Sequence, residues 1–283
     1  MINRPPSPKS PKDENIARLF KLGKCEGRIF ETDALKFLQS LPDQSADLLF
    51  LDPPFNLNKA YSVRSPKLDS KTPEEYGCWL SLIAAESVRV LAPGGTLFAY
   101  HIPIWAFRLA NQFSADLKFL HWIAVSMKNG FPRGRKLYPA HYALLMFSRG
   151  AAKNFSRPKL KPSLCRHCKK SIKDYGGYRD IIERNGGVNL SDFWDDLSPV
   201  RHASRKHRSQ NELPEKLFER IFSISGVEGG VYIDPFAGAG SGVIQAACNG
   251  MNFQACDIVK DNCSIITERL RTLKKGIENK GAR

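Results

Sequence analysis

An apolar run that ends on two prolines constrains the fold of this chain more than any other feature. Residues 45–51 have the length and nearly continuous apolar character of a strand that is buried on both faces of a sheet. Asp52-Pro53-Pro54-Phe55 follows directly, and two consecutive prolines cannot continue a central strand. The chain must therefore leave the sheet here, which places these residues at a carboxyl edge, where open α/β sheets bind their ligands.

Helical and strand patterns alternate along most of the chain. We expect helices at 34–38, 73–90, 104–118, 213–223, 243–249 and 261–275, and a short helix at 15–22. Besides 45–51, strands are expected at 96–100, 122–126, 142–147, 231–233 and 253–257. This order predicts an α/β fold of the Rossmann-like type, with a doubly wound, mostly parallel sheet. A chain of 283 residues with 42% hydrophobic content can bury such a core as one domain with an insertion.

A glycine-rich turn follows the strand at 231–233. Its sequence is Asp234-Pro235-Phe236-Ala237-Gly238-Ala239-Gly240-Ser241-Gly242, and such a turn between strand and helix lets backbone N–H groups approach a ligand closely. Asp257 ends the next strand, where its carboxylate can bind ribose hydroxyls. The glycine spacing differs from a dinucleotide fingerprint and argues against a nicotinamide enzyme. The alternative is a tight turn that binds no ligand.

The residue types of Asp52-Pro53-Pro54-Phe55 suit methyl transfer to an exocyclic amine. Such an amine is a poor nucleophile because its lone pair is delocalised into the ring. The Asp52 carboxylate and the Pro53 carbonyl can each accept one N–H, which directs the lone pair at a methyl donor. The prolines, Pro53 and Pro54, stiffen the loop, and Phe55 offers a ring for stacking on a base taken out of the duplex. The alternative is that Asp-Pro-Pro only starts a loop.

The segment 150–210 lacks the periodicity of the rest and is predicted to be an insertion. Within 151–210, 14 Lys and Arg face 6 Asp and Glu, so that +8 of the formal net charge of +15 lies in this segment. Two aromatic residues, Tyr178 and Trp194, and the basic run 201–208 place aromatic rings and cations together. This composition predicts a DNA-recognition surface, with a solvated basic loop as the alternative.

Cysteine usage and the N-terminal segment bear on the cellular location. Seven cysteines, an odd number mostly within apolar or helical sequence, are typical of a reducing compartment. Cys165 and Cys168 have the spacing of half a zinc site that His202 and His207 could complete, but we favour two reduced cysteines and no metal. Neither a signal peptide in residues 1–13 nor a membrane-spanning run is recognisable. We therefore expect a cytoplasmic protein without membrane contact.

Together the two motifs resemble the beta class of amino-group DNA methyltransferases, in which the catalytic loop precedes the cofactor loop. The resemblance covers about residues 24–272. It includes Asp33-Ala34-Leu35, Asp52-Pro53-Pro54-Phe55-Asn56, Ala92-Pro93-Gly94-Gly95, Leu213-Pro214-Glu215-Lys216-Leu217 and the glycine-rich turn. It implies S-adenosyl-L-methionine as cofactor, Asp33 near its adenine, and Asp234, Phe236, Gly238, Gly240 and Ser241 in the cofactor loop.

Three positions differ from the family pattern. Phe55 stands where Tyr is usual, which keeps a stacking ring but removes a hydroxyl. Asp257 replaces the more frequent Glu and shortens the side chain by one methylene. Residues 211–214 stand where a Lys-Pro pair is commoner, so a charge contact from this helix to the cofactor is not expected.

The resemblance implies methylation of double-stranded DNA by base flipping, with adenine N6 as the target because Asp52 is similar to the adenine enzymes. Cytosine N4 is the alternative, and methylation of protein glutamine or of RNA, or a non-catalytic DNA-binding module, are more distant ones. A cognate restriction endonuclease is a candidate partner, and the chain is expected as a monomer or a homodimer. The predicted divisions are a tail (1–14), a catalytic half (15–149), the recognition insertion (150–210), a cofactor half (211–275) and a second tail (276–283).

Overall fold

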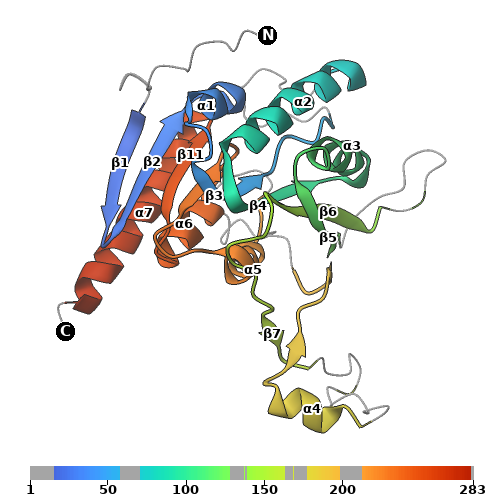
Figure 1. The fold of residues 1–283 in the computed structure, drawn as a ribbon. Coiled ribbons are helices and arrows are strands. Elements are labelled where there is room, and N and C mark those ends of the chain that lie inside the picture. Colours follow the sequence, from blue (N-terminus) through green and yellow to red (C-terminus); the bar gives the residue numbers. More distant parts are fainter. Residues whose placement is uncertain are drawn as a thin grey trace.

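A nine-stranded mixed sheet forms the centre of the protein in a computed structural model that describes residues 16–57, 71–127, 137, 139–162, 168, 177–197 and 212–281 (Figure 1). The strand order is β1-β2-β11-β10-β3-β4-β6-β5-β9. These strands are β1 (Ile16–Leu22), β2 (Cys25–Glu31), β3 (Ala46–Leu51), β4 (Leu91–His101), β5 (Lys118–Ser126), β6 (His141–Ser148), β9 (Phe193–Trp194), β10 (Val231–Asp234) and β11 (Asn252–Asp257).

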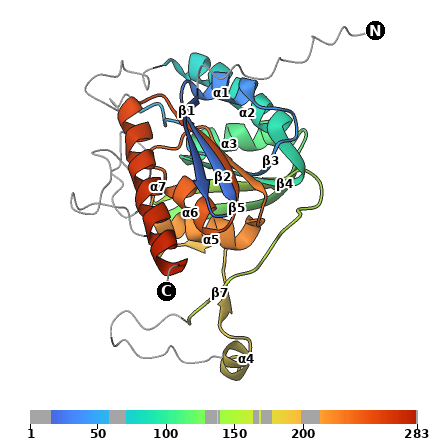
Figure 2. The same cartoon turned by 90° about the vertical axis from the view of Figure 1, so that its left-hand side faces the viewer.

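Helices cover both faces of this sheet. They are α1 (Ala34–Ser40), α2 (Pro73–Val90), α3 (Pro103–Phe113), α5 (Glu215–Ser225), α6 (Ser241–Cys248) and α7 (Lys260–Gly281). Helices α1 to α3 lie on one face and α5 to α7 on the other (Figures 1 and 2). Alternate residues of β3 follow this division: Leu48 and Phe50 pack in the core with α5 to α7, whereas Leu49 and Leu51 pack in the core with α1 to α3. The apolar run at 45–51 is thus a strand buried on both faces, as predicted.

Five neighbouring strands, β2, β11, β10, β3 and β4, are parallel. Their carboxyl ends therefore meet at one edge of the sheet. From β10 the chain passes through α6 to β11 on one side, and from β3 it passes through α2 to β4 on the other side. The chain direction thus diverges between β10 and β3, which is where a doubly wound sheet binds its ligands. The predicted α/β class with a mostly parallel sheet is confirmed.

Several predicted elements need correction. The stretch predicted as a short helix at 15–22 is strand β1, which pairs antiparallel with β2, a strand that the pattern did not reveal. Helix α3 ends at Phe113, because residues from Lys118 onward pair with β6 as strand β5. Pro214 is the N-cap of α5 and does not lie inside its first turn. Helix α7 extends to Gly281, so most of the predicted tail at 276–283 is helical.

The predicted insertion is divided between two surroundings. Its outer part holds β7 (Lys159–Leu160), α4 (Arg179–Arg184) and β8 (Val188–Asn189), and it projects from the body of the protein (Figures 1 and 2). Its inner part joins the main sheet, because β9 pairs with β5 and Trp194 is buried in the core. We had expected the segment 150–210 to lie outside the sheet, but its inner part belongs to the sheet. The predicted tail at 1–14 lies outside the described residues.

Candidate active site

The predicted site residues converge on the carboxyl edge of the five parallel strands. Asp52 follows β3, Asp234 ends β10 and Asp257 ends β11, while Asp33 lies two residues beyond β2. Burial raises the pKa of the Cys256 thiol well above its usual value, and the charges of Asp257, Asp234 and Asp33 raise it further. Those three carboxylates therefore all lie near the Cys256 thiol. Asp52 extends the group by one strand, since β3 is the neighbour of β10.

Asp52 faces aromatic side chains. Burial raises the pKa of Tyr100 and Tyr142, and the negative charge of Asp52 raises both further. The ring of Phe55 lies 6.1 Å from that of Tyr100 and 5.6 Å from that of Tyr142. Phe55, the predicted stacking residue, thus belongs to an aromatic group next to the predicted catalytic carboxylate, as a site for a flat base requires.

The beginning of α2 holds the far end of the predicted catalytic loop. Asn56 has a left-handed backbone (φ 55°), a conformation that Asn tolerates better than most residues. Its side-chain amide donates to the carbonyl of Lys71 (2.9 Å), and its side-chain oxygen accepts from the Lys71 amide (3.0 Å). Tyr76 Oη donates to the carbonyl of Pro54. Asn56 belongs to the motif recognised in the sequence. The sequence gave no indication of its partners, because residue 71 is distant along the chain.

The glycine-rich turn adopts a conformation that requires glycine. Gly238 has φ 54° and Gly240 has φ 81°, and a Cβ at Gly240 would also lie 2.7 Å from Ile266. Ser241 begins α6 directly after Gly240. The two acids hold this turn: Asp257 accepts from the Gly238 amide (2.9 Å), and Asp234 accepts from the Phe236 amide (3.0 Å) and from the hydroxyl of Tyr232 (2.9 Å).

The residues at this turn suit a nucleoside cofactor with a carboxylate group. The backbone N–H groups at the start of α6 favour an anion. Asp257 also accepts from the amide of Val259 (2.8 Å), yet a carboxylate has about four acceptor positions, which is compatible with accepting a ribose hydroxyl as well. Asp33 accepts from the amides of Leu35 and Lys36 as the N-cap of α1. Its observed contacts are those of a helix cap, and its predicted contact with adenine stays a prediction.

Arg269 of α7 is a supporting residue that the sequence reading missed. Its guanidinium donates to the carbonyl of Ala239 (2.7 Å) and to the hydroxyl of Ser241 (3.3 Å) in the turn, and to Glu215 of α5 (2.8 Å). Burial lowers its pKa, which Glu215 and Glu212 partly offset. Arg269 thus joins the glycine-rich turn to the beginning of α5. A lone Arg in an amphipathic helix carries no sequence signal for this role.

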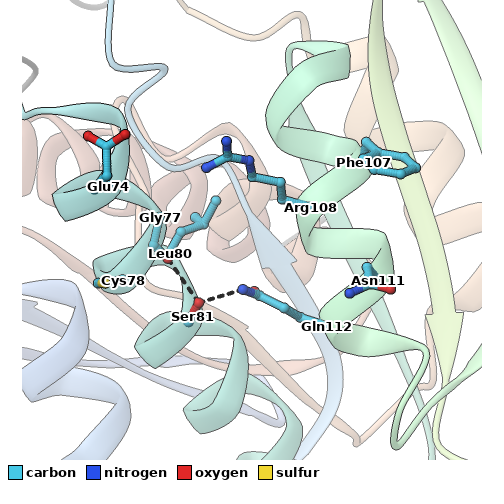
Figure 3. A pocket seen from close by; sticks show the side chains of 9 residues that line it. All are labelled: Glu74, Gly77, Cys78, Leu80, Ser81, Phe107, Arg108, Asn111 and Gln112. Atoms are coloured by element: carbon cyan, nitrogen blue, oxygen red, sulfur yellow. Dashed lines mark hydrogen bonds between the residues drawn. The ribbon is translucent and has the colours of Figure 1, made fainter.

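A separate hollow lies between α2 and α3 (Figure 3). Ser81 and Gln112 are hydrogen-bonded across it. None of its lining residues is a predicted site residue. The hollow is therefore distinct from the edge that gathers the motifs.

Of the zinc candidates, Cys165, His202 and His207 lie outside the described residues, and only Cys168 is described. Among the described helices, none is both long and apolar enough to cross a lipid bilayer.

The fold and this edge suit a class of proteins that bind a nucleoside cofactor at a glycine-rich turn, beside a second ligand at a carboxylate on the adjacent strand. The chain belongs to the DNA methylase family of N6 and N4 methyltransferases, whose model matches residues 46–268. The Type II methyltransferase M.BamHI of Bacillus amyloliquefaciens is 40% identical over 250 residues, which are 88% of this chain. The chain spans 58% of the length of that relative.

Solved structures share the fold. The PvuII DNA methyltransferase (cytosine-N4-specific) matches with a TM-score of 0.59 at 15% identity, over 94% of this chain and 96% of that one. The M1.HpyAVI–SAM complex matches with a TM-score of 0.57 at 18% identity, over 86% of this chain and 98% of that one. The predicted family and fold are therefore confirmed.

Proposed function

We propose that this protein transfers a methyl group from S-adenosyl-L-methionine to an exocyclic amino nitrogen of a base in double-stranded DNA. One observation supports this most strongly. Asp52 follows β3 and the glycine-rich turn follows β10, and these two neighbouring parallel strands end at the same edge of the sheet. A carboxylate and a cofactor site are then adjacent, as direct transfer between two bound molecules requires. The dsDNA substrate is supported by the family match and by the basic insertion.

In the proposed mechanism the cofactor supplies an electrophilic methyl group on a positively charged sulfur. Asp52 accepts one N–H of the amine and the Pro53 carbonyl accepts the other, so that the nitrogen lone pair points at the methyl carbon. On transfer the amine nitrogen would lose one proton, for which Asp52 is the acceptor. Phe55 stacks on the flipped base and holds its plane. The proposed cofactor site consists of Asp33, Asp234, Phe236, Gly238, Gly240, Ser241 and Asp257.

The target base is the finer part of the proposal. Adenine N6 is supported by Asp52, whose type is similar to that in the adenine enzymes. Cytosine N4 carries the same kind of amine, and the geometry of the edge serves both. A cognate restriction endonuclease, a monomeric or homodimeric state and a cytoplasmic location stay predictions from the sequence.

Expression in a bacterial host that lacks DNA methylation tests the proposal. Genomic DNA is hydrolysed to nucleosides, which are measured by mass spectrometry, and cells that express Asp52→Ala are the control. We expect N6-methyladenine from the wild-type protein only. N4-methylcytosine would retain amino-group methylation but overturn adenine as the target. Unmodified DNA, despite folded protein that binds S-adenosyl-L-methionine, would overturn DNA as the substrate, and failure to bind that cofactor would leave the non-catalytic DNA-binding alternative.

A further inference from the structure

Behind the catalytic loop lies a buried chain of hydrogen bonds that the proposed chemistry does not use. Tyr76 of α2 is 2% exposed and His101 at the end of β4 is fully buried. Tyr76 Oη lies 2.7 Å from His101 Nε2 and donates to the carbonyl of Pro54. At the other end of the chain, the amide of Ile102 donates to His101 Nδ1 (2.8 Å). Four groups from three segments of the sequence thus form one line that ends on the loop.

The direction of each bond in this line is determined. Nδ1 of His101 accepts from the Ile102 amide, so it carries no proton. Burial lowers the pKa of His101 to about 3, so the ring is neutral and its one proton is on Nε2. Nε2–H therefore donates to Tyr76 Oη, which leaves the Tyr76 hydroxyl proton for the Pro54 carbonyl. Donors in such a line polarise one another, which strengthens the last bond.

The same two side chains also bear on Phe55. The His101 ring lies 5.0 Å from the Phe55 ring, at an interplanar angle of 33°. The carbonyl that Tyr76 binds belongs to the peptide group that joins Pro54 to Phe55. Tyr76 thus fixes the orientation of this peptide group, and His101 lies against the Phe55 ring. The Tyr76 ring is itself held in place, because it packs edge-on against Trp105 at 4.6 Å.

We propose that Tyr76 and His101 are positioning residues for methyl transfer, which fix the Pro54–Phe55 peptide group and so set the place of the Phe55 ring against the target base. Neither residue touches the reacting atoms. The inference rests on the proposed function, because it assigns the pair to that same site. A purely structural role would instead satisfy two buried polar side chains and affect stability alone.

Removal of the Tyr76 hydroxyl distinguishes the two roles. For Tyr76→Phe we expect the single-turnover rate of methyl transfer to fall about 3- to 10-fold, the worth of one neutral hydrogen bond, and the dissociation constant of S-adenosyl-L-methionine to stay within about twofold. Ser87→Ala is the matched control, since Ser87 is a fully buried hydroxyl of the same helix that donates to Ile83. It should lose stability but keep its rate. An unchanged rate in Tyr76→Phe, or an equal loss in Ser87→Ala, would overturn the proposal.

Two substitutions of His101 supply a second readout. His101→Gln can still donate to Tyr76 from the position of Nε2, whereas His101→Asn can still accept from Ile102 but does not reach Tyr76. Both variants lose the ring that lies against Phe55, so the comparison between them isolates the hydrogen bond to Tyr76. We expect His101→Gln to retain a rate closer to that of the wild type than His101→Asn does. Equal rates for the two variants would contradict the proposal. Thermal unfolding of each variant checks its fold, and Tyr76→Phe alone decides if the His101 variants do not fold. A wild-type protein without activity would instead refute the proposed function.

Discussion

At the scale of single residues, four acids lie at the active edge and their neighbours differ. Asp33, Asp234 and Asp257 each accept hydrogen bonds from backbone amides of a cap or turn. Asp52 lies close enough to Tyr100 and Tyr142 for its charge to raise the pKa of both hydroxyls. Three of the acids therefore shape the backbone at the proposed cofactor site, and Asp52 lies beside the aromatic group where we propose that a base binds. This position supports Asp52 as the acid for catalysis.

The buried His101 should make stability depend on pH. Its pKa is about 3 in the folded protein and about 6.5 in an unfolded chain, so between these values the unfolded state binds one more proton. The neutral ring contributes to the free energy of unfolding above about pH 6.5. This contribution is lost as the pH falls toward 3, by up to about 1.4 kcal/mol per pH unit. Urea unfolding of the wild type and of His101→Gln between pH 7 and 5 measures this. The stability difference between the two should shift in favour of His101→Gln at low pH; a difference that is constant with pH would contradict the neutral, buried ring.

The sequence indicated the two loops of the candidate site better than it indicated the residues that support them. Two prolines and three glycines act on their own backbone, so both loops were recognisable locally. The contact of Tyr76 with Pro54 and His101 joins three separate segments, and the link of Asn56 to Lys71 joins two. Such partners depend on how helix α2 packs, which no local pattern reveals.

At the scale of elements, α5 is held by ion pairs on both sides. Glu215 at its beginning binds Arg269 of α7, which also binds the glycine-rich turn. Further along, Lys216 and the buried Arg220 both donate to Asp196, at 2.6 Å each. Burial would raise the pKa of Asp196, but these two cations lower it to about 2. Asp196 lies two residues after β9, so α5 connects the end of the insertion with the cofactor side of the site.

Substitution of Arg269 should loosen the glycine-rich turn. We expect Arg269→Gln to lower the free energy of unfolding by about 1.5–3 kcal/mol, as the loss of a hydrogen-bonded charge does, and to raise the dissociation constant of S-adenosyl-L-methionine about tenfold. Calorimetry and chemical denaturation measure the two effects. Arg271→Gln on the same helix is the control, since Arg271 is exposed and its ion pair with Glu268, at 3.7 Å, is a surface pair, so it should behave as the wild type. Equal affinity in both variants would refute this role for Arg269.

Strand β1 shows why one element was predicted wrongly. In Ile16–Leu22 the apolar residues Ile16, Leu19, Phe20 and Leu22 follow a helical spacing. The segment is nevertheless an edge strand, because it pairs with β2 and leaves Leu19 exposed. Tertiary pairing outweighs local periodicity in so short a segment.

At the scale of the whole molecule, the two ends of the sheet differ, because the basic insertion lies at one of them. The projecting part of the insertion emerges beside β9, at one end of the strand order, whereas β1 lies at the other end (Figure 1). The insertion carries more than half of the net charge of +15. We therefore expect the polyanion to bind near the β9 end of the sheet.

Salt dependence of DNA binding tests this placement. Lys159 and Lys161 are exposed in the insertion, and Lys21 is exposed on β1. We expect the combined substitution Lys159→Gln and Lys161→Gln to reduce the slope of log K against log salt by up to about 1.8, since each phosphate contact contributes about 0.9. Lys21→Gln should leave the slope unchanged. The same change in slope for both variants would show that binding does not favour the insertion.

Catalysis by Asp52 is the central claim of this account, and the activity of Asp52→Ala tests it most directly. Purified wild-type and variant proteins are compared for transfer of a radiolabelled methyl group to DNA, and calorimetry measures binding of S-adenosyl-L-methionine. We predict that the variant loses at least about 100-fold in rate while its cofactor dissociation constant stays within about twofold. A variant that retains a rate near that of the wild type would contradict the assignment of Asp52 as the catalytic carboxylate.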